Sequence, residues 1–135
     1  MAMEAMGAGL KTILSTISGL HIYAPAELPD SIDPPCALIL PGETLYDIDF
    51  DADYDCVLRL VILIAKPDQP SAINKILDYI EPTGVNSIVA AVKVDRTLSS
   101  SCADAKVIRN LGVGFTTWGG INYISTEFII QIWSL

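Results

Sequence analysis

The sequence has little charge, and most of that charge is negative. Only 18% of its 135 residues are charged, and eight Lys and Arg stand against sixteen Asp and Glu, which gives a formal net charge of −8. Surfaces that bind nucleic acids need clustered cations, so this balance argues against general DNA or RNA binding. Because 51% of the residues are hydrophobic, the composition also excludes intrinsic disorder. So much apolar surface on a small acidic chain suggests that other subunits cover part of it.

Cysteine and histidine are scarce as well. Cys36, Cys56 and Cys102 are odd in number, widely spaced and without a CxxC pair, so we expect a reducing cytoplasm rather than a disulfide framework. His21 is the only histidine, which excludes His-rich zinc sites. No catalytic pair that needs histidine can form without that one residue.

Long apolar runs and nucleotide-binding motifs are missing too. The longest apolar run, residues 57–65, is interrupted by Arg59 and is too short to cross a bilayer. Residues 1–9 lack the basic region of a signal peptide. Neither GxGxxG nor GxxxxGK[ST] occurs. We therefore expect no membrane partner and no cofactor.

Three short segments have the apolar spacing of amphipathic helices, and the length of the chain predicts one domain over residues 1–135. The apolar positions are Leu10, Ile13, Leu14 and Ile17 in the first segment, Ile73, Ile76, Leu77 and Ile80 in the second, and Val85, Ile88, Val89 and Val92 in the third. Ser18-Gly19 suits the end of the first helix, and Pro82 follows the second. Each helix is one-sided and needs a sheet to pack on.

The remaining patterned segments predict strands. Residues 36–40 form a compact apolar run that ends at Pro41-Gly42, and every even position of residues 46–64 is apolar. Residues 46–64 are too many for one strand, so we expect a bend or hairpin near residues 51–53. The second half, residues 57–65, is apolar on both faces, which predicts a central strand. A closing hairpin turns at Gly119-Gly120, with Val107, Leu111, Val113 and Phe115 on one face of its first strand. In its second strand, one face carries Ile124, Phe128, Ile130 and Ile132. The order predicts one α+β domain with a mainly antiparallel sheet and helices on one face.

Five aspartates stand at alternate positions in residues 47–55, which we call the acidic segment. They are Asp47, Asp49, Asp51, Asp53 and Asp55. Alternating carboxylates suggest a calcium loop, but no register supplies the glycine and glutamate that an EF-hand requires. A solvated strand face is the more economical interpretation. Residues 1–58 carry a net −9 and the remainder a net +1, so the acidity is concentrated near this segment.

Two tryptophans are candidate contacts between subunits. Trp118 adjoins the expected turn, and Trp133 lies in the very apolar C-terminal stretch. Tryptophan is enriched at the energetic centres of protein interfaces. Packing within the core or the turn explains both positions equally well, so both interpretations stay open.

Several local stretches, taken in order, resemble one protein family over nearly the whole chain. They are residues 19–23, 29–35, 36–39, 57–65, 82–84 and 95–98, the Gly119-Gly120 hairpin leading to Tyr123, and Glu127-Phe128. The chain resembles the tail terminators of long-tailed bacteriophages, small tail-completion proteins that are themselves similar to minor tail and head–tail joining proteins. None of these stretches is a catalytic signature.

The resemblance implies a structural virion protein and no enzyme. Tail terminators form a homohexameric ring that caps the head-proximal end of the tail tube, stops tube polymerisation and presents a surface to the neck. The expected partners are other copies of the chain, the tail tube protein and a neck or connector protein. The implied location is the virion tail, with assembly in the host cytoplasm.

A ring also gives the acidic segment a role. Viral DNA passes through the lumen of such a ring without specific binding, and a basic wall would hold its phosphates. We therefore predict that the five aspartates line the lumen or form an acidic strip at its mouth. A head–tail connector, such as a stopper or adaptor, is the alternative function. A metal-binding enzyme using residues 47–55 and a plain bacterial adaptor domain are further alternatives.

Overall fold

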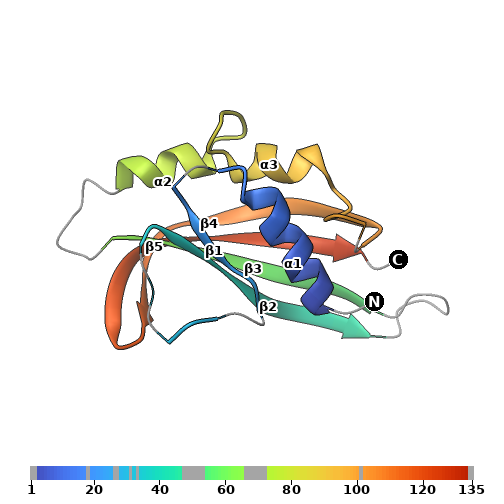
Figure 1. The fold of residues 1–135 in the computed structure, drawn as a ribbon, viewed down its shortest axis with the longest axis horizontal. Coiled ribbons are helices and arrows are strands. Elements are labelled where there is room, and N and C mark those ends of the chain that lie inside the picture. Colours follow the sequence, from blue (N-terminus) through green and yellow to red (C-terminus); the bar gives the residue numbers. More distant parts are fainter. Residues whose placement is uncertain are drawn as a thin grey trace.

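A single five-stranded sheet with three helices makes up the described part of the protein (Figure 1). The computed structural model describes residues 3–17, 19–25, 28–30, 32, 34–46, 54–65, 73–100 and 102–133. In chain order the elements are α1 (Met3–Leu14), β1 (His21–Tyr23), β2 (Cys36–Tyr46), β3 (Tyr54–Ala65), α2 (Ile73–Ile80), α3 (Ile88–Val94), β4 (Asp104–Trp118) and β5 (Ile121–Trp133). The predicted α+β class is confirmed.

The strands lie in the order β1-β2-β3-β5-β4, so β3 is central and β4 forms one edge. All pairings are antiparallel except that of β1 with β2, which is parallel. The predicted mainly antiparallel sheet and the central position of residues 57–65 are therefore confirmed. The parallel contact joins His21 to Cys36 and Tyr23 to Leu38, and the segment between β1 and β2 makes the crossover.

The main core lies between the sheet and the helices, which all cover the same face (Figure 1). Side chains alternate between the two faces of a strand, and here even-numbered positions of β3 and β5 point to the helices. On this face the sheet contributes Leu58, Leu60, Ile62, Ile124, Phe128, Ile130 and Ile132. The alternation read from the sequence thus assigns the faces of both strands correctly.

The helices differ from their predicted limits and faces. The positions Leu10, Ile13, Leu14 and Ile17 are all buried as predicted, but α1 already begins at Met3. In α2 the buried side chains are Ile76 and Tyr79, while Leu77 is 53% exposed. Ser87 caps α3 and accepts a hydrogen bond from the Ala90 N–H at 3.1 Å, so the helix begins at Ile88. Val85 therefore lies before the helix rather than on its buried face, and it is 91% exposed.

A smaller apolar cluster covers part of the opposite face of the sheet. It consists of Cys36, Leu38, Val61, Leu63 and Tyr123, with Leu28, Ile32 and Trp118 packed against it. Leu28 and Ile32, which lie between β1 and β2, thus cover this part of the sheet face opposite the helices. The remainder of this face carries an ion pair in which Arg59 donates to both carboxylate oxygens of Glu127, at 2.7 and 3.1 Å.

The strand predicted to end at Pro41-Gly42 continues to Tyr46. A register shift between Pro41 and Thr44 lets β2 pass the proline, and bulges and edges are where a sheet tolerates proline. Tyr46 then pairs with Tyr54, so the chain reverses direction between these residues. This agrees with the predicted hairpin, although residues 47–53 lie outside the described residues.

Candidate functional site

The predicted acidic strip is only partly within the described structure. Asp47, Asp49, Asp51 and Asp53 lie outside the described residues. The backbone of Asp55 is in β3, where it pairs with Leu45 on one side and with Trp133 on the other. The role of this strip in a lumen or at its mouth therefore stays a prediction.

The two tryptophans occupy different environments. Trp118 is half-buried in the smaller cluster, and its indole Nε1–H donates to the Pro29 carbonyl oxygen at 2.8 Å. It thereby fixes the segment between β1 and β2 to the end of β4. Trp133 is 39% exposed at the end of β5, and its carbonyl oxygen accepts from the Ala103 N–H at 2.9 Å. Of the two, Trp133 offers more surface to a partner.

A group of large apolar side chains on the β4–β5 hairpin is exposed to solvent. These side chains, which we call the hairpin patch, are Leu111, Val113, Phe115 and Ile121, and they are 56%, 45%, 71% and 42% exposed. Phe115 pairs with Ile124 on the helix-covered face and Ile121 pairs with Trp118 on the opposite face, so the hairpin patch extends over both faces of the hairpin. The sequence pattern placed three of them with Val107 on one face of a strand, but only Val107 packs against the main core. The reason is the edge position of β4, whose side chains have neighbouring strands on one side only. Sequence alternation does not reveal which strand is an edge.

A hydrogen-bond network fixes the backbone beneath the hairpin patch. The register of β4 and β5 shifts between Asn110 and Val113, and Gly112 adopts a φ of 81° there. The Thr126 hydroxyl donates to the Gly112 carbonyl at 2.9 Å and accepts from the Asn110 amide at 2.7 Å. The Asn110 Oδ1 accepts from the Gly112 N–H at 2.8 Å. Since Thr126 is 2% exposed, this bulge is held from inside the fold.

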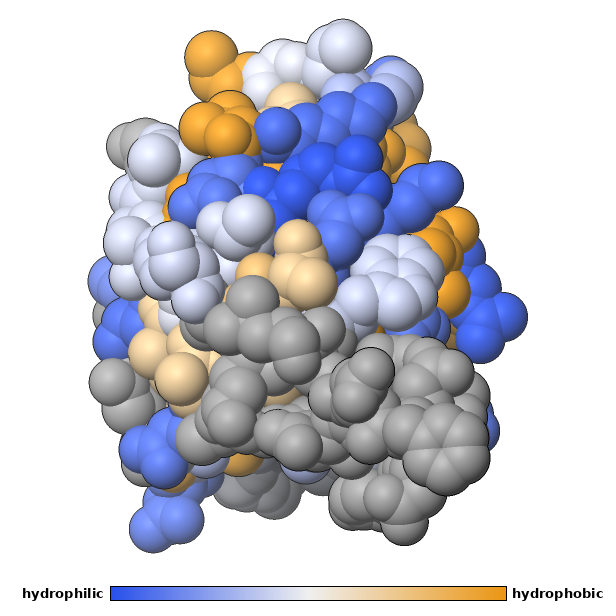
Figure 2. All heavy atoms as spheres, turned by 90° about the vertical axis from the view of Figure 1, so that its right-hand side faces the viewer, coloured by the Kyte–Doolittle hydropathy of each residue, from blue (hydrophilic) through white to orange (hydrophobic). Residues whose placement is uncertain are grey.

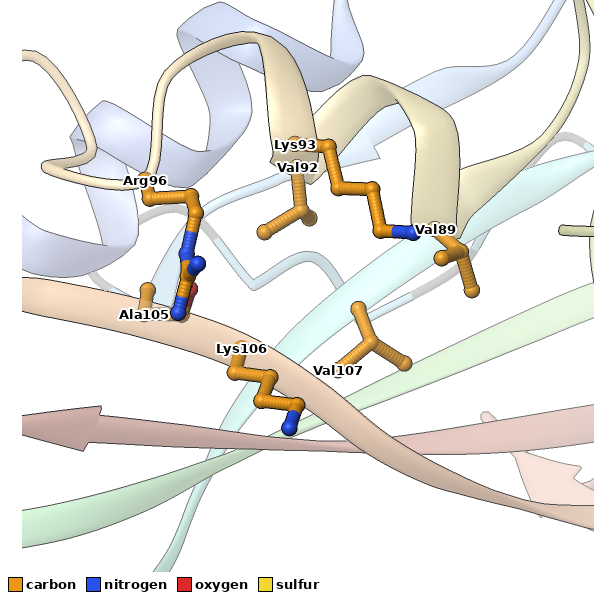
Figure 3. Close-up of a pocket in the computed structure, with 7 residues that line it drawn as sticks. All are labelled: Val89, Val92, Lys93, Arg96, Ala105, Lys106 and Val107. Carbon is orange, nitrogen blue, oxygen red and sulfur yellow. The ribbon is translucent and has the colours of Figure 1, made fainter. Parts of the chain in front are cut away.

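A groove with an apolar floor and basic borders lies between α3 and the beginning of β4 (Figure 3). It has a volume of about 190 Å³ and is lined by Val89, Val92, Lys93, Arg96, Ala105, Lys106 and Val107. Figure 3 shows Val92 and Val107 pointing into the space between helix and strand, with the Lys93 ammonium beside Val89. Lys106 extends from β4 to the other side of the strand. We call this feature the α3–β4 groove.

Arg96 closes one end of the α3–β4 groove. Its guanidinium pairs with the Asp104 carboxylate at 2.8 Å and donates through Nε to the Ala105 carbonyl at 3.3 Å. This contact ties the residues after α3 to the outer edge of β4. Lys93 and Lys106 show no ion pair among the described residues. The Lys93 charge is therefore uncompensated at the groove, while the Lys106 ammonium lies on the other side of β4.

The loop that follows α3 is organised around one carboxylate. Asp95 accepts hydrogen bonds from the Thr97 hydroxyl at 2.6 Å, the Thr97 N–H at 3.1 Å and the Ser99 N–H at 3.1 Å. These bonds lower the pKa of the Asp95 carboxyl, with the Thr97 hydroxyl as the largest cause. Leu98, Ser99 and Ser100 all have positive φ, so the loop is held in a conformation that L-residues rarely adopt.

The two ends of the sheet differ in surface character. Figure 2 faces the end near Trp133 and the start of β4, and a band of hydrophilic residues crosses it. The β4–β5 turn, next to the hairpin patch, lies at the opposite end (Figure 1). One end of the described structure therefore carries a hydrophilic band near the exposed Trp133, and the other carries the hairpin patch.

Reactive and metal-binding groups are sparse in the part of the chain that the structure describes. No group of three or more His, Cys, Asp or Glu there is suited to hold a metal ion. All three cysteines are buried and none is in a disulfide, and burial, with nearby Asp104 and Asp95, raises the pKa of the Cys102 thiol to about 11. His21 is exposed on β1. Within the same residues, no helix has the length and hydropathy that crossing a bilayer requires.

Comparison with known proteins adds no assignment. No protein-family model matches the chain, and no curated protein matches it.

Proposed function

We propose that the chain is a phage tail terminator that assembles into a homohexameric ring and acts without an enzymatic step. The observation that carries this proposal is the hairpin patch. Its four large apolar side chains are exposed on a protomer that has a well-packed core on the helix-covered face of its sheet. Apolar surface gains about 25 cal/mol per Å² when it leaves water, so a contact with another protein surface would stabilise it.

The difference between the two ends of the sheet favours a ring over a twofold dimer. A ring needs head-to-tail contacts, in which each subunit offers two different surfaces. The hairpin patch lies at one end of the sheet, and the polar surface with the α3–β4 groove lies toward the other. Unlike surfaces at opposite ends are what a head-to-tail arrangement uses.

The biological role rests on the resemblance of the ordered local stretches. In the structure these stretches form β1, the start of β2, most of β3, the α2–α3 connection, the loop after α3 and the β4–β5 turn. We propose that the ring caps the head-proximal end of the tail tube and joins it to the neck in the virion. Viral DNA would pass through a lumen whose mouth or wall carries the acidic segment.

Native mass spectrometry and electron microscopy of the chain with its tail tube test the proposal. We expect a closed ring that sits on one end of the tube, and loss of the chain from the phage should give overlong tails. Tails of normal length that fail to join heads would instead identify a head–tail connector. A chain that stays monomeric with and without tail tubes would contradict both functions.

A metal-dependent enzyme is tested separately. Calorimetry with Ca²⁺, Mg²⁺ or Mn²⁺ at millimolar concentration should show no binding to the chain. Saturable binding that is lost when the five aspartates become asparagines would support a metal site in residues 47–55 and contradict the proposed role of this segment.

A further inference from the structure

Part of the sheet face opposite the helices is open. Paired residues of neighbouring antiparallel strands point to the same face of a sheet. Ile129 of β5 pairs with Arg59 on one side and with Arg109 on the other, and Gln131 in the next row pairs with Lys106. These rows lie beyond the smaller apolar cluster, and the side chains of Lys106 and Arg109 are exposed. The three helices cover the other face (Figure 1).

Three cations lie together on this open part, and we call Arg59, Lys106 and Arg109 the basic strip. Paired residues have Cβ atoms about 5 Å apart, so Arg59 and Arg109 lie about 10 Å apart across Ile129. Figure 3 shows Lys106 extending to this side of β4, away from α3. Arg59 is bound to Glu127, but Lys106 and Arg109 have no ion pair among the described residues. Two of the three cations are therefore available to a partner.

The outer side of α2 has the complementary composition. Ile76 and Tyr79 are buried, so the outward positions of this helical turn are Leu77, Asp78 and Glu81, which we call the α2 crest. The Glu81 N–H donates to the Leu77 carbonyl at 3.1 Å, which continues the helical turn to the second carboxylate. Leu77 is half-exposed, and neither carboxylate has an ion pair within the described part of the chain. The crest thus presents one apolar side chain between two available acids.

We propose that the α2 crest of one protomer docks on the basic strip of a neighbouring copy of the chain. The carboxylates of Asp78 and Glu81 pair with Lys106 and Arg109, and Leu77 packs on the apolar stems of these cations. The inference rests on the proposed ring, for which it names the two unlike surfaces of the head-to-tail contact.

The fold excludes the same chain as the source of the crest. α2 packs on one face of the sheet and the basic strip lies on the other, so no chain can bring its own crest to its own strip. In a pair of copies, one crest and one strip stay unoccupied, because each protomer carries them on opposite sides. The contact therefore repeats from copy to copy and closes only as a ring.

The positions along the sheet agree with this arrangement. α2 lies toward the end that carries the β4–β5 turn (Figure 1). Lys106 pairs with Gln131, two residues before Trp133, so the basic strip extends toward the opposite end. The contact thus joins the hairpin end of one protomer to the Trp133 end of the next.

Charge favours a second copy over nucleic acid as the occupant. Copies of a chain with a net charge of −8 repel one another, so they associate best where cations of one meet acids of the next. Three of the eight Lys and Arg form the basic strip, which makes it such a place. A DNA duplex would find two available cations there and net repulsion from the whole chain, whereas stable binding needs several phosphate contacts.

Charge reversal on each surface tests the contact. The strip variant carries Lys106→Glu and Arg109→Glu, and the crest variant carries Asp78→Lys and Glu81→Lys. All four side chains are exposed, so the urea midpoint of each variant should stay near that of the unaltered chain. Native mass spectrometry, with and without tail tubes, should show that each variant needs at least about tenfold more protein to form rings. Lys93→Glu and Glu4→Lys, on the helix-covered side, are the matched controls and should assemble normally.

Mixing the two variants gives the decisive measurement. The basic crest of one variant meets the acidic strip of the other, and the remaining junction keeps the native pair. The mixture should therefore form rings in which the variants alternate, and isotope labelling of one variant should show equal numbers of both. Folded variants that fail to assemble when mixed, variants that assemble alone as the unaltered chain does, or an equal loss in the controls would overturn the proposal.

Further outcomes separate the contact from the proposed function. If the unaltered chain and both variants form the same rings on tail tubes, this contact is wrong while the ring function stands. If the mixture restores rings that do not bind tail tubes, the contact holds and the terminator function fails. Anisotropy with a labelled DNA duplex should show no binding at physiological salt. Saturable binding that the strip variant loses would assign the basic strip to phosphates and overturn the proposal.

Discussion

The backbone of α1 at Gly9 packs directly against the backbone of Leu98. A Cβ atom added to Gly9 would lie 2.0 Å from the Leu98 carbonyl oxygen and 2.8 Å from its carbonyl carbon. Leu98 is itself buried and has a φ of 49°. Because Gly9 has no side chain, the loop after α3 can lie directly against α1.

Gly9→Ala should destabilise the fold. In an exposed helix the change would gain about 1 kcal/mol. Here the added methyl group meets backbone that cannot move aside freely, so we expect a net loss of about 1–3 kcal/mol in the free energy of unfolding. Urea denaturation measures it. Gly114→Ala is the control, because no heavy atom lies within 4 Å of an added Cβ there. A more stable Gly9→Ala variant would contradict the contact.

Thr126→Val should weaken the bulge under the hairpin patch. The change keeps the side-chain shape but leaves the Gly112 carbonyl and the Asn110 amide without the hydroxyl. Loss of such a buried partner costs about 1–3 kcal/mol of unfolding free energy. Chemical denaturation gives the value, with Thr83→Val on the exposed α2–α3 connection as the control. Equal stability of both variants would show that the network does not support the bulge.

Asp95 should make stability fall at acid pH. Its folded pKa is lowered, chiefly by the Thr97 hydroxyl, so its contribution is present above the unfolded value of about 3.9. That contribution is lost as the pH falls through the lowered folded pKa. Asp95→Asn should therefore show a flatter dependence of stability on pH below about 4. Urea midpoints across this range test the difference, and parallel curves would contradict it.

The cysteines should not react while the protein is folded. Cys36, Cys56 and Cys102 are all buried, and the raised pKa of the Cys102 thiol keeps it protonated at about pH 8. An aromatic disulfide reagent should label no thiol in native buffer and all three cysteines in urea. Fast labelling of one thiol without denaturant would show that its site opens.

Phe115→Lys should prevent ring formation without unfolding the protomer. Phe115 is 71% exposed, so the change should alter the free energy of unfolding by no more than about 0.5 kcal/mol. Native mass spectrometry should then show monomers where the unaltered chain gives rings. Val85→Lys is the matched control, since Val85 is 91% exposed in the α2–α3 connection. Rings of equal stability in both variants would place the contact elsewhere.

Sequence patterns predicted the strand faces and the closing turn because these depend on local alternation. Even positions such as Leu60 and Phe128 do face the helices. Gly119 and Gly120 adopt φ values of 60° and 80°, as a tight hairpin turn requires. Such features follow from the period of a strand and from the freedom of glycine, so a single chain segment contains the information.

Other features depend on tertiary neighbours that no local pattern reveals. Leu77 fits the helical stripe of α2, but Ile76 and Tyr79 are the side chains of α2 that are buried in the main core. Phe115 fits the alternation of a half-buried strand, but β4 is an edge strand and the Phe115 side chain is exposed. The α3–β4 groove was missed because Lys93 and Val107 belong to different elements. An excess of bases after residue 58 was the one sequence signal that pointed toward it.

The two edges of the sheet resist uncontrolled pairing in different ways. β1 offers three residues, and β4 offers fifteen that are interrupted by two register shifts. Neither is a long, regular template on which identical chains can stack into fibrils. A chain with these edges is protected from edge-to-edge aggregation at high concentration. In the proposed ring, contact between subunits would then depend on side chains rather than on strand pairing.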